Sequence, residues 1–343
     1  MTEPSRARPR AGSGRTPGVA RGRLLAAGLA LVLAPGCAEA PAAPTAVVLE
    51  LERLAFVPPG SSSPWVLPQD VRVGVDAPLL VDRFELRRRD VLELGLGLPV
   101  ARGWADDHGA WDGTAGDLPA CADWSEARDL ASRRGMRLPT PSEWLYVAAG
   151  RIGHRYPWGR IPQRSVANTL ELDLLRPSPV GAFESGRGPF GTYDQIGNVW
   201  EWVDGRVEGI GPLDLAGAEL VDGAAAAGDL RSVLGGSYLS RTRPLWDVRR
   251  EVTEPLVFYA QTLDPAHRAP DVGLRCVADA ETWLWTAGVA APVLEPDQAE
   301  RVRRVGAGWV ETGEAALVEL LEDLAGRDGA PPLVGLLLEG ARR

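Results

Sequence analysis

Gly197-Asn198-Val199-Trp200-Glu201-Trp202 is the stretch that decides the fold of this chain. It lies between Arg137-Leu138-Pro139-Thr140-Pro141-Ser142-Glu143-Trp144 and Gly235-Gly236-Ser237-Tyr238. Around these islands Gly and Pro recur at short intervals, and the chain holds 12 Trp against 2 Met. Large rigid rings, each with an indole donor, must therefore hold irregular backbone in place. This composition predicts a loop-rich domain with small sheets.

Composition excludes several function classes. The chain has 343 residues, of which 45% are apolar and 24% charged, so it can bury a sizeable core. All 37 basic residues are Arg, because no Lys occurs. Schiff-base and lysine general-base mechanisms are therefore excluded. The net charge of -9 becomes more negative without the Arg-rich first residues, which disfavours nucleic-acid binding.

The amino terminus has the pattern of an export signal over residues 1–36. Arg21 and Arg23 precede the apolar run 24–33, which is too short to cross a bilayer. The run ends at Ala34-Pro35-Gly36-Cys37, which resembles the lipobox of bacterial lipoproteins. We therefore expect lipidation of Cys37, a tether over residues 37–46, and a protein held at the cell envelope by its lipid anchor. Free secretion after ordinary cleavage and an uncleaved anchor are the alternatives.

The two remaining cysteines, Cys121 and Cys276, would lie in an oxidising compartment after export. We predict a disulfide between them. The alternative is a pair of buried free thiols, because spacing alone does not establish that they are close.

Two helices are predicted from their capping residues. Asp123 with Glu126 forms a capping box, and Gly135 provides a stop. The next helix starts from Thr140, with Pro141 at the first helical position, and ends before Gly150. Elsewhere the apolar runs are brief, such as 71–75 and 79–84, and indicate short strands.

Residues 279–343 differ in composition and predict a small carboxy-terminal helical appendage. Segments 296–305 and 314–324 have apolar residues at helical spacing, and the second forms a leucine stripe. Gly326 ends that stripe, and Pro331-Pro332 opens a last segment, 333–338. We expect the last segment to pack back on the stripe as a helical hairpin. Whether the appendage docks on the main domain or on a partner stays open.

With these residues laid out, the segment 47–278 resembles the formylglycine-generating enzyme family, also called the sulfatase-modifying factor family. The resemblance implies an α+β fold, a loop-rich variant of the C-type lectin fold with small sheets and two helices. The matching islands, in order, are Phe56-Val57-Pro58-Pro59-Gly60, Trp124 with Ala127, Arg137 to Thr140 with Glu143-Trp144, Tyr156-Pro157-Trp158-Gly159, Pro179-Val180-Gly181, Tyr193-Asp194, Gly197 to Trp202, Gly235 to Tyr238, and Gly273-Leu274-Arg275.

The resemblance also implies where catalytic cysteines would lie. Aerobic members of the family hold copper(I) with two cysteines shortly after the Gly-Gly-Ser-Tyr motif, and here those positions fall at about Ser240 and Leu245. A hydroxyl and an isobutyl group cannot replace two thiolates. Iron chemistry, as in the related sulfoxide synthases, needs clustered histidines, whereas His108, His154 and His267 are far apart in sequence. No copper or iron is expected.

Structural calcium is the cofactor that the resemblance leaves open. Asn198 and Glu201 match one calcium site of the family, and Asn168 matches the opening of another, with Asp173 as its substitute acid. Oxygen ligands on loops suit Ca²⁺. The structural alternative is that Asn198 and Glu201 satisfy buried backbone amides in a tight turn.

Other residues are candidates for a pocket. Arg249 and Arg250 lie where the family has a pocket arginine, but Asp247 and Glu251 beside them also favour a structural ion pair. Trp104 and Trp111 would stack on a sugar or peptide, or anchor a long loop. Together with Ser240 and Leu245 these residues form the candidate pocket, and no catalytic residue is assigned. No histidine lies at a sequence spacing from Ser237 that would indicate a catalytic pair, so Ser237 is not predicted to be a nucleophile.

Two function classes remain. The favoured one is a binding or interaction module at the envelope, whose ligand is an envelope protein or a glycan. The alternative is a divergent periplasmic oxidoreductase or protein-maturation enzyme of the same family. What would discriminate them is whether Ser240, Leu245, Arg249 and Arg250 line a deep cleft or a filled one.

Overall fold

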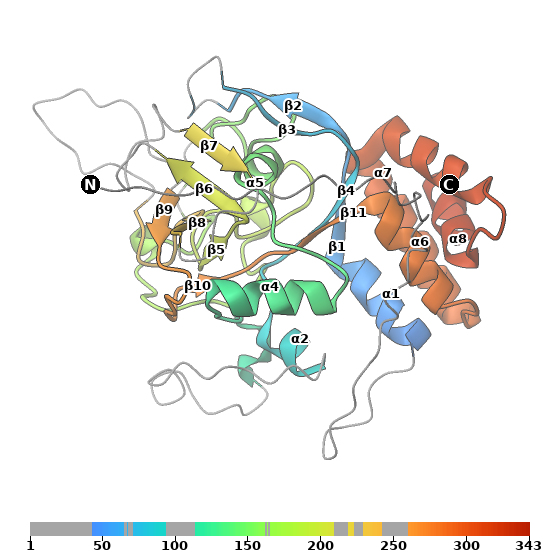
Figure 1. The fold of residues 1–343 in the computed structure, drawn as a ribbon, viewed down its shortest axis with the longest axis horizontal. Coiled ribbons are helices and arrows are strands. Elements are labelled where there is room, and N and C mark those ends of the chain that lie inside the picture. Colours follow the sequence, from blue (N-terminus) through green and yellow to red (C-terminus); the bar gives the residue numbers. More distant parts are fainter. Residues whose placement is uncertain are drawn as a thin grey trace, which may run out of the picture. The chain divides into compact units, whose positions relative to one another are not determined.

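The computed structural model describes residues 43–64, 67, 71–93, 114–161, 163, 165–208, 219–222, 229–241 and 260–343. Figure 1 shows small sheets, helices and long loops, which confirms the predicted α+β class. The helices are α1 (Ala43–Arg53), α2 (Arg88–Glu93), α4 (Trp124–Arg133), α5 (Pro141–Ala149), α6 (Ala280–Ala290), α7 (Pro296–Ala325) and α8 (Pro332–Ala341), with single 3-10 turns at Thr114–Asp117, Leu170–Leu172 and Glu184–Gly186.

Four small sheets carry the described strands. The strands are β1 (Leu54–Val57), β2 (Gly60–Ser62), β3 (Val73–Val75), β4 (Leu79–Asp82), β5 (Trp200–Trp202), β6 (Gly205–Glu208), β7 (Glu219–Asp222), β8 (Arg231–Leu234), β9 (Ala260–Leu263), β10 (Val272–Gly273) and β11 (Val277–Asp279). One sheet has the order β1-β4-β11 and is antiparallel throughout. Another has the order β10-β5-β8-β9, in which β10 pairs parallel to β5. The pairs β2-β3 and β6-β7 complete the set.

The two capped helices are confirmed. The Asp123 carboxylate accepts from the Glu126 amide at 2.9 Å, and Glu126 accepts from the Asp123 amide at 2.9 Å. The same reciprocal pair forms between Thr140 and Glu143 at the start of α5. Such caps satisfy amides that a helix leaves unpaired, and they need only residues three apart, so the sequence reveals them.

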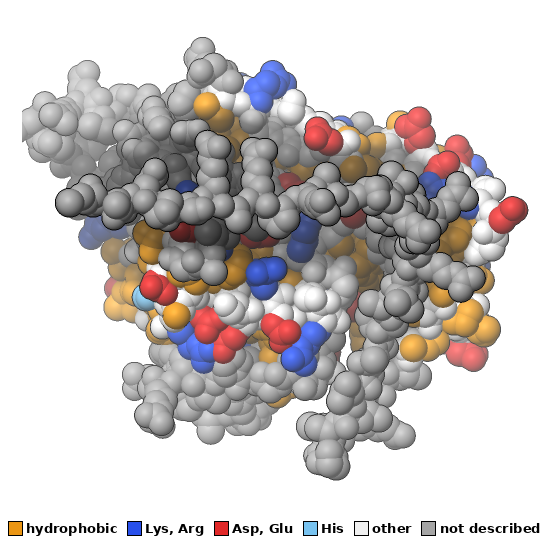
Figure 2. All heavy atoms as spheres, viewed as in Figure 1, with side chains coloured by type: hydrophobic (Ala, Val, Ile, Leu, Met, Phe, Trp, Pro, Cys, Tyr) orange, Lys and Arg blue, Asp and Glu red, His pale blue; other side chains and the backbone are white. Residues whose placement is uncertain are grey.

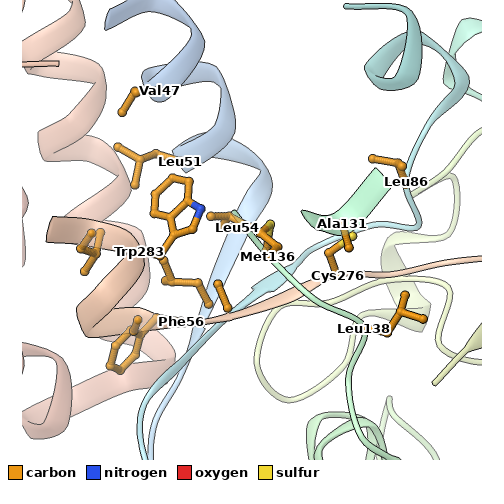
Figure 3. Packing of buried hydrophobic residues seen from close by; sticks show 14 of the residues in the cluster. Val47, Leu51, Leu54, Phe56, Leu86, Ala131, Met136, Leu138, Cys276 and Trp283 are labelled. Atoms are coloured by element: carbon orange, nitrogen blue, oxygen red, sulfur yellow. The ribbon is translucent and has the colours of Figure 1, made fainter. Parts of the chain in front are cut away.

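Helix α1 begins at Ala43, inside the segment that the sequence predicts as a tether. Pro44 suits a first helical turn, and Val47, Val48 and Leu51 turn one apolar face inward. This face belongs to a cluster that also holds Leu54 of β1 and Trp283 of α6 (Figure 3). Burial of the apolar face is what makes this segment a helix, and the Ala- and Pro-rich sequence alone does not show it.

The carboxy-terminal helices form the predicted hairpin, with one difference. Segments 296–305 and 314–324 are a single helix, α7, and α8 packs against it. Three glycines lie between the two segments, and two of them have packing reasons. A Cβ at Gly306 would lie 2.2 Å from the Leu337 carbonyl oxygen, and one at Gly313 would lie 2.5 Å from the Phe56 ring. These glycines therefore allow close approach without ending the helix.

The hairpin is docked on the rest of the protein. The Trp309 indole of α7 donates to the Leu54 carbonyl at 2.9 Å, and the Thr312 hydroxyl donates to the Phe56 carbonyl at 3.2 Å. One apolar cluster runs from α1 and β1 through α6 to α7 and α8. The boundary expected between residues 278 and 279 falls inside β11, and the described residues belong to one compact unit.

The predicted disulfide is wrong. Cys121 and Cys276 are both buried free thiols. The Cys121 thiol donates to the Pro270 carbonyl at 3.2 Å, whereas Cys276 belongs to the apolar cluster that holds Ala131 and Met136 (Figure 3). Each thiol therefore occupies its own packed environment, which is the alternative that spacing could not exclude.

The surface mixes charges of both signs. On the face shown in Figure 2, Arg side chains lie next to Asp and Glu side chains below the centre of the view. Ion pairs such as Arg133–Asp129 at 2.9 Å account for such neighbours. Among the helices that the structure describes, none combines the length and the apolar character needed to cross a bilayer.

Candidate functional site

The central motif forms a tight turn that leads into β5. Gly197 and Asn198 both have positive φ, 82° and 56°. The Gly197 amide donates to the Gly235 carbonyl at 3.1 Å, and the Asn198 amide donates to the Asn168 carbonyl at 2.7 Å. A Cβ at Gly197 would lie 2.2 Å from that same Asn168 oxygen. The motif therefore needs glycine here, because it joins two other segments of the chain at this point.

Asn198 is the centre of a buried hydrogen-bond network. Its Nδ2 donates to Glu85 Oε2 at 2.6 Å. Its Oδ1 accepts from Asn168 Nδ2 at 3.1 Å, from the Ser178 amide at 2.9 Å and from the Ser178 hydroxyl at 3.2 Å. Glu85 also accepts from the Val199 amide at 3.0 Å. The side chain thus fixes three loops against one another.

Glu201 makes a buried ion pair. Its carboxylate accepts from Arg275 Nη2 at 2.6 Å, from Arg275 Nε at 3.0 Å and from the Trp144 indole at 2.6 Å. Arg275 also donates to the carbonyls of Asp82 at 2.8 Å and Tyr193 at 2.6 Å. The Arg137–Trp144, Gly197–Trp202 and Gly273–Arg275 islands therefore meet at one carboxylate.

These contacts test the fit of a calcium ion. A Ca²⁺ site needs about six to eight oxygen ligands. Asn198 Oδ1 is already taken up by three donors, and Glu201 is neutralised by Arg275. Asn168 is buried, whereas Asp173 is exposed at the end of a 3-10 turn. In the described part of the chain no group of three or more His, Cys, Asp or Glu side chains is placed to hold a metal. The contacts of Asn198 and Glu201 fit the structural alternative, whereas the buried Asn168 Oδ1 accepts no hydrogen bond and could serve as a ligand. Calcium binding stays a prediction.

Burial alters the pKa of two acids at this site, Glu85 of the Asn198 network and Asp194. Burial raises the pKa of Glu85 well above its usual value, and the negative charges of Asp194 and Glu201 add to the effect. Burial likewise raises the pKa of Asp194 to about 6, although its carboxylate accepts from the Gly181 amide at 2.5 Å. The folded protein therefore holds protons at this site that the unfolded chain releases.

Asp194 gives a prediction about pH. Its pKa is near 3.8 in the unfolded chain and about 6 in the folded protein. The stabilisation from this raised pKa is complete below about pH 4 and is lost as the pH rises through 6. From pH 4 to pH 7 the wild-type free energy of unfolding should therefore fall by about 2–3 kcal/mol more than that of Asp194→Asn. Urea unfolding at both pH values measures the difference.

The control for this experiment is the exposed acid Asp129, which pairs with Arg133 on the surface of α4. The Asp129→Asn variant should follow the wild type at both pH values. Identical pH profiles for the wild type and Asp194→Asn would show that Asp194 ionises normally.

Ser240 closes a second turn, next to the Gly-Gly-Ser-Tyr motif. Its Oγ accepts from the Ser237 amide at 2.9 Å, and its own amide donates to the Ser237 carbonyl at 2.8 Å. The Ser240 carbonyl accepts from the Leu170 amide at 2.9 Å. Ser237 Oγ donates to Asp271 Oδ2 at 2.9 Å. Both hydroxyls therefore hold backbone in place, and neither contacts a histidine in these bonds.

Burial keeps the two described thiols in their protonated form. Burial raises the pKa of Cys121 to about 12, in spite of the nearby Arg88 guanidinium. Burial also raises the pKa of Cys276 well above its usual value. Both are protonated at neutral pH, whereas metal binding and nucleophilic attack need a thiolate.

Several expected residues lie outside the described part of the chain. They are Cys37, Trp104, His108, Trp111, Leu245, Arg249 and Arg250. The structure brings Asn168 and Asn198 together through their side chains, and it places Ser240 on the segment that binds Leu170. Glu201 does not join this pair of asparagines through the bonds described above, and its carboxylate contacts Arg275 and Trp144 instead.

The sequence does not predict the roles of three residues at this site. They are the buried acids Glu85 and Asp194, and Arg275 as the partner of Glu201. A signal was available for Glu85, because it follows the apolar run 79–84 directly and an acid there is a candidate for burial. Asp194 has positive φ, 57°, which no spacing reveals. The pairing of Arg275 with Glu201 spans 74 residues and depends on the fold.

The chain is similar to proteins of one known family. The family model described as "Sulfatase-modifying factor enzyme 1-like domain" matches residues 105–280. An inactive C-alpha-formylglycine-generating enzyme 2 of Bos taurus is 29% identical over 198 residues, which cover 53% of this chain and 58% of that protein. A formylglycine-generating enzyme of Streptomyces coelicolor is 31% identical, with 49% of this chain and 54% of that protein covered.

A hercynine oxygenase of Mycolicibacterium thermoresistibile is 36% identical, over 33% of this chain and 27% of that protein. The chain thus spans about half the length of the curated relatives, or less. Among solved structures, Treponema denticola variable protein 1 is similar with a TM-score of 0.49 and 15% identity, covering 66% of this chain and 94% of that chain.

Proposed function

Because this chain belongs to the sulfatase-modifying factor enzyme 1-like domain family, we propose that it is an exported, lipid-anchored member that binds an envelope protein or a glycan and no longer makes formylglycine. Its domain would act as a rigid scaffold that displays loops. The alternative is a divergent periplasmic oxidoreductase or protein-maturation enzyme of the same family, and an assay with a cysteine-containing peptide tests it.

One observation carries this proposal: the position of the first expected copper ligand is occupied by a structural serine. Ser240 accepts from the Ser237 amide and holds the Leu170 segment through its carbonyl. The second position is Leu245, whose side chain has no donor atom for a metal. Cys121 and Cys276 do not take over the role, because both are buried and protonated.

Two further observations support the loss of chemistry. Glu201 and Asn198 are held by protein partners, so the fold alone explains why these side chains stand in the motif 197–202. One of the similar proteins is described as an inactive formylglycine-generating enzyme, so the family includes a member without that activity.

The lipid anchor is proposed from Cys37 and the position of α1. Helix α1 begins at Ala43, six residues after Cys37, and such a segment spans at most about 20 Å. A lipid on Cys37 would therefore keep the domain next to the membrane. Replacement of Cys37 by Ser is expected to abolish the incorporation of labelled palmitate into the protein, with the wild type as its control.

The activity test uses a cysteine-containing peptide substrate and copper(I). We expect no conversion of the peptide cysteine by this protein, measured by mass spectrometry, because Ser240 and Leu245 stand at the expected ligand positions and the two described thiols are buried and protonated. The formylglycine-generating enzyme of Streptomyces coelicolor serves as the positive control. Turnover by this protein above the background of copper alone would overturn the proposed loss of activity.

A further inference from the structure

One segment of this acidic protein has the opposite charge. Residues 144–170 contain Arg151, Arg155, Arg160 and Arg164 and no Asp or Glu, in a chain whose net charge is -9. Two of these arginines are each followed by an isoleucine, as Arg151-Ile152 and Arg160-Ile161. Ile152 is 76% exposed and Ile161 is 71% exposed. Single exposed apolar residues need no explanation, but two of them beside arginines are a pattern.

The first Arg-Ile pair lies on a rigid turn. Gly150 and Gly153 flank it with positive φ, 69° and 66°. The Gly153 amide donates to the Gly150 carbonyl at 3.2 Å, and the His154 amide donates to the Ala149 carbonyl at 2.6 Å. A Cβ at Gly153 would lie 2.4 Å from the Ser63 carbonyl oxygen, just after β2. The turn therefore packs closely against the residue that follows β2, while the Ile152 side chain is exposed to solvent.

The second pair follows a tight hairpin. Tyr156 and Gly159 exchange two backbone hydrogen bonds of 2.9 Å, and the Tyr156 and Trp158 rings stack with centroids 5.1 Å apart. The Trp158 indole donates to the Ile161 carbonyl at 3.1 Å. This bond fixes the backbone that carries Ile161. Hydrogen bonds of the local backbone and of Trp158 thus fix the two turns that expose Ile152 and Ile161.

The positive charges of this segment act on their surroundings. The pKa of His154 is lowered by burial first and by the positive charge of Arg160 second. Arg187 is 3.8 Å from Glu311, whose side chain is 70% exposed, so solvent weakens that pair.

We propose that the two turns, residues 150–153 and 156–161, form a membrane-contact surface that binds anionic phospholipid headgroups. The isoleucines would enter the interface between headgroups and acyl chains. Arg160 would contact lipid phosphates, and so would the donors of Arg151 that are not used by its 3.4 Å bond to the Thr312 carbonyl. A bilayer fits this arrangement better than a peptide does, because apolar side chains at the tips of turns protrude, whereas bound peptides lie in grooves or along strand edges. This proposal goes beyond the proposed binding role and does not require the lipid on Cys37.

The test is hydrogen exchange of the full chain, read at residues 150–161. Vesicles of phosphatidylcholine with about one-third phosphatidylglycerol are compared with vesicles of phosphatidylcholine alone. We expect exchange in this segment to slow at least about fivefold with anionic vesicles only, since one arginine near such a surface contributes a factor of about five. Because the readout is local, attachment through the amino terminus does not produce it. Membrane contact here and loss of formylglycine chemistry can therefore fail independently.

Matched variants separate contact from folding. Ile152→Ser with Ile161→Ser should abolish the slowing, and so should Arg151→Ser with Arg160→Ser. Val289→Ser with Val293→Ser, at positions 60% and 72% exposed on and after α6, should leave it intact. Exchange elsewhere in each variant reports whether the protein is folded. Equal exchange with both vesicle types would overturn the proposal, as would slowing by soluble polyglutamate but not by vesicles, which would assign the surface to acidic polymers.

Discussion

A chain that ends after Ala291 is expected not to fold. This truncation removes α7 and α8, whose buried side chains are part of the cluster that also holds α1, β1 and α6; they include Val302, Trp309, Leu317, Leu321, Leu324, Leu333, Val334 and Leu337. Each such side chain contributes about 1.5–3 kcal/mol when buried. For the eight named side chains the sum is about 12–24 kcal/mol, which equals or exceeds the total stability of most domains, about 5–15 kcal/mol. Circular dichroism and urea unfolding of the truncated chain measure the effect.

Single substitutions test the same claim within a folded protein. Leu321→Ala should lower the free energy of unfolding by about 2–5 kcal/mol, because it leaves a cavity in the shared cluster. Arg303→Ala is the matched control on α7, because its ion pair with Glu339 lies at the surface, where solvent screens the two charges. Cooperative unfolding of the truncated chain at wild-type urea concentrations would show that the helices are a separate appendage.

Arg275→Met is expected to destabilise the protein by about 3–5 kcal/mol, because the buried Glu201 carboxylate would lose the cation that neutralises it and keep only the Trp144 indole as a partner. The carbonyls of Asp82 and Tyr193 would also lose a donor. Urea unfolding near pH 7 measures the loss.

The matched control for this variant is the double substitution Arg275→Met with Glu201→Gln. It removes the unpaired charge and should recover part of the lost stability. If Arg275→Met alone is as stable as the wild type, the ion pair does not organise this site.

The parts of the fold that the sequence predicts are the parts with local causes. Helices α4 and α5 follow from capping residues three positions apart. The hairpin of α7 and α8 follows from the leucine stripe and the two prolines. The sequence does not predict helix α1, because this helix is stabilised by contacts with residues far along the chain. Val47, Val48 and Leu51 pack against α6 and α7.

The site shows the same division. The motif 197–202 identifies the turn, and the turn does lie at the centre of the buried network. The roles of its side chains depend on residues far along the chain: Glu85 for Asn198, and Arg275 for Glu201. The cysteine pairing failed for the same reason, because no spacing shows which neighbours Cys121 and Cys276 acquire in the fold.

The central claim, a family fold without its copper chemistry, is tested most directly by a copper(I) titration of the purified protein against a competing chelator. This measurement needs no knowledge of a substrate, so it is independent of the choice of peptide. We predict no stoichiometric binding, because a serine and a leucine stand at the expected ligand positions and the described thiols are buried and protonated. One tightly bound copper(I) per chain would contradict the account.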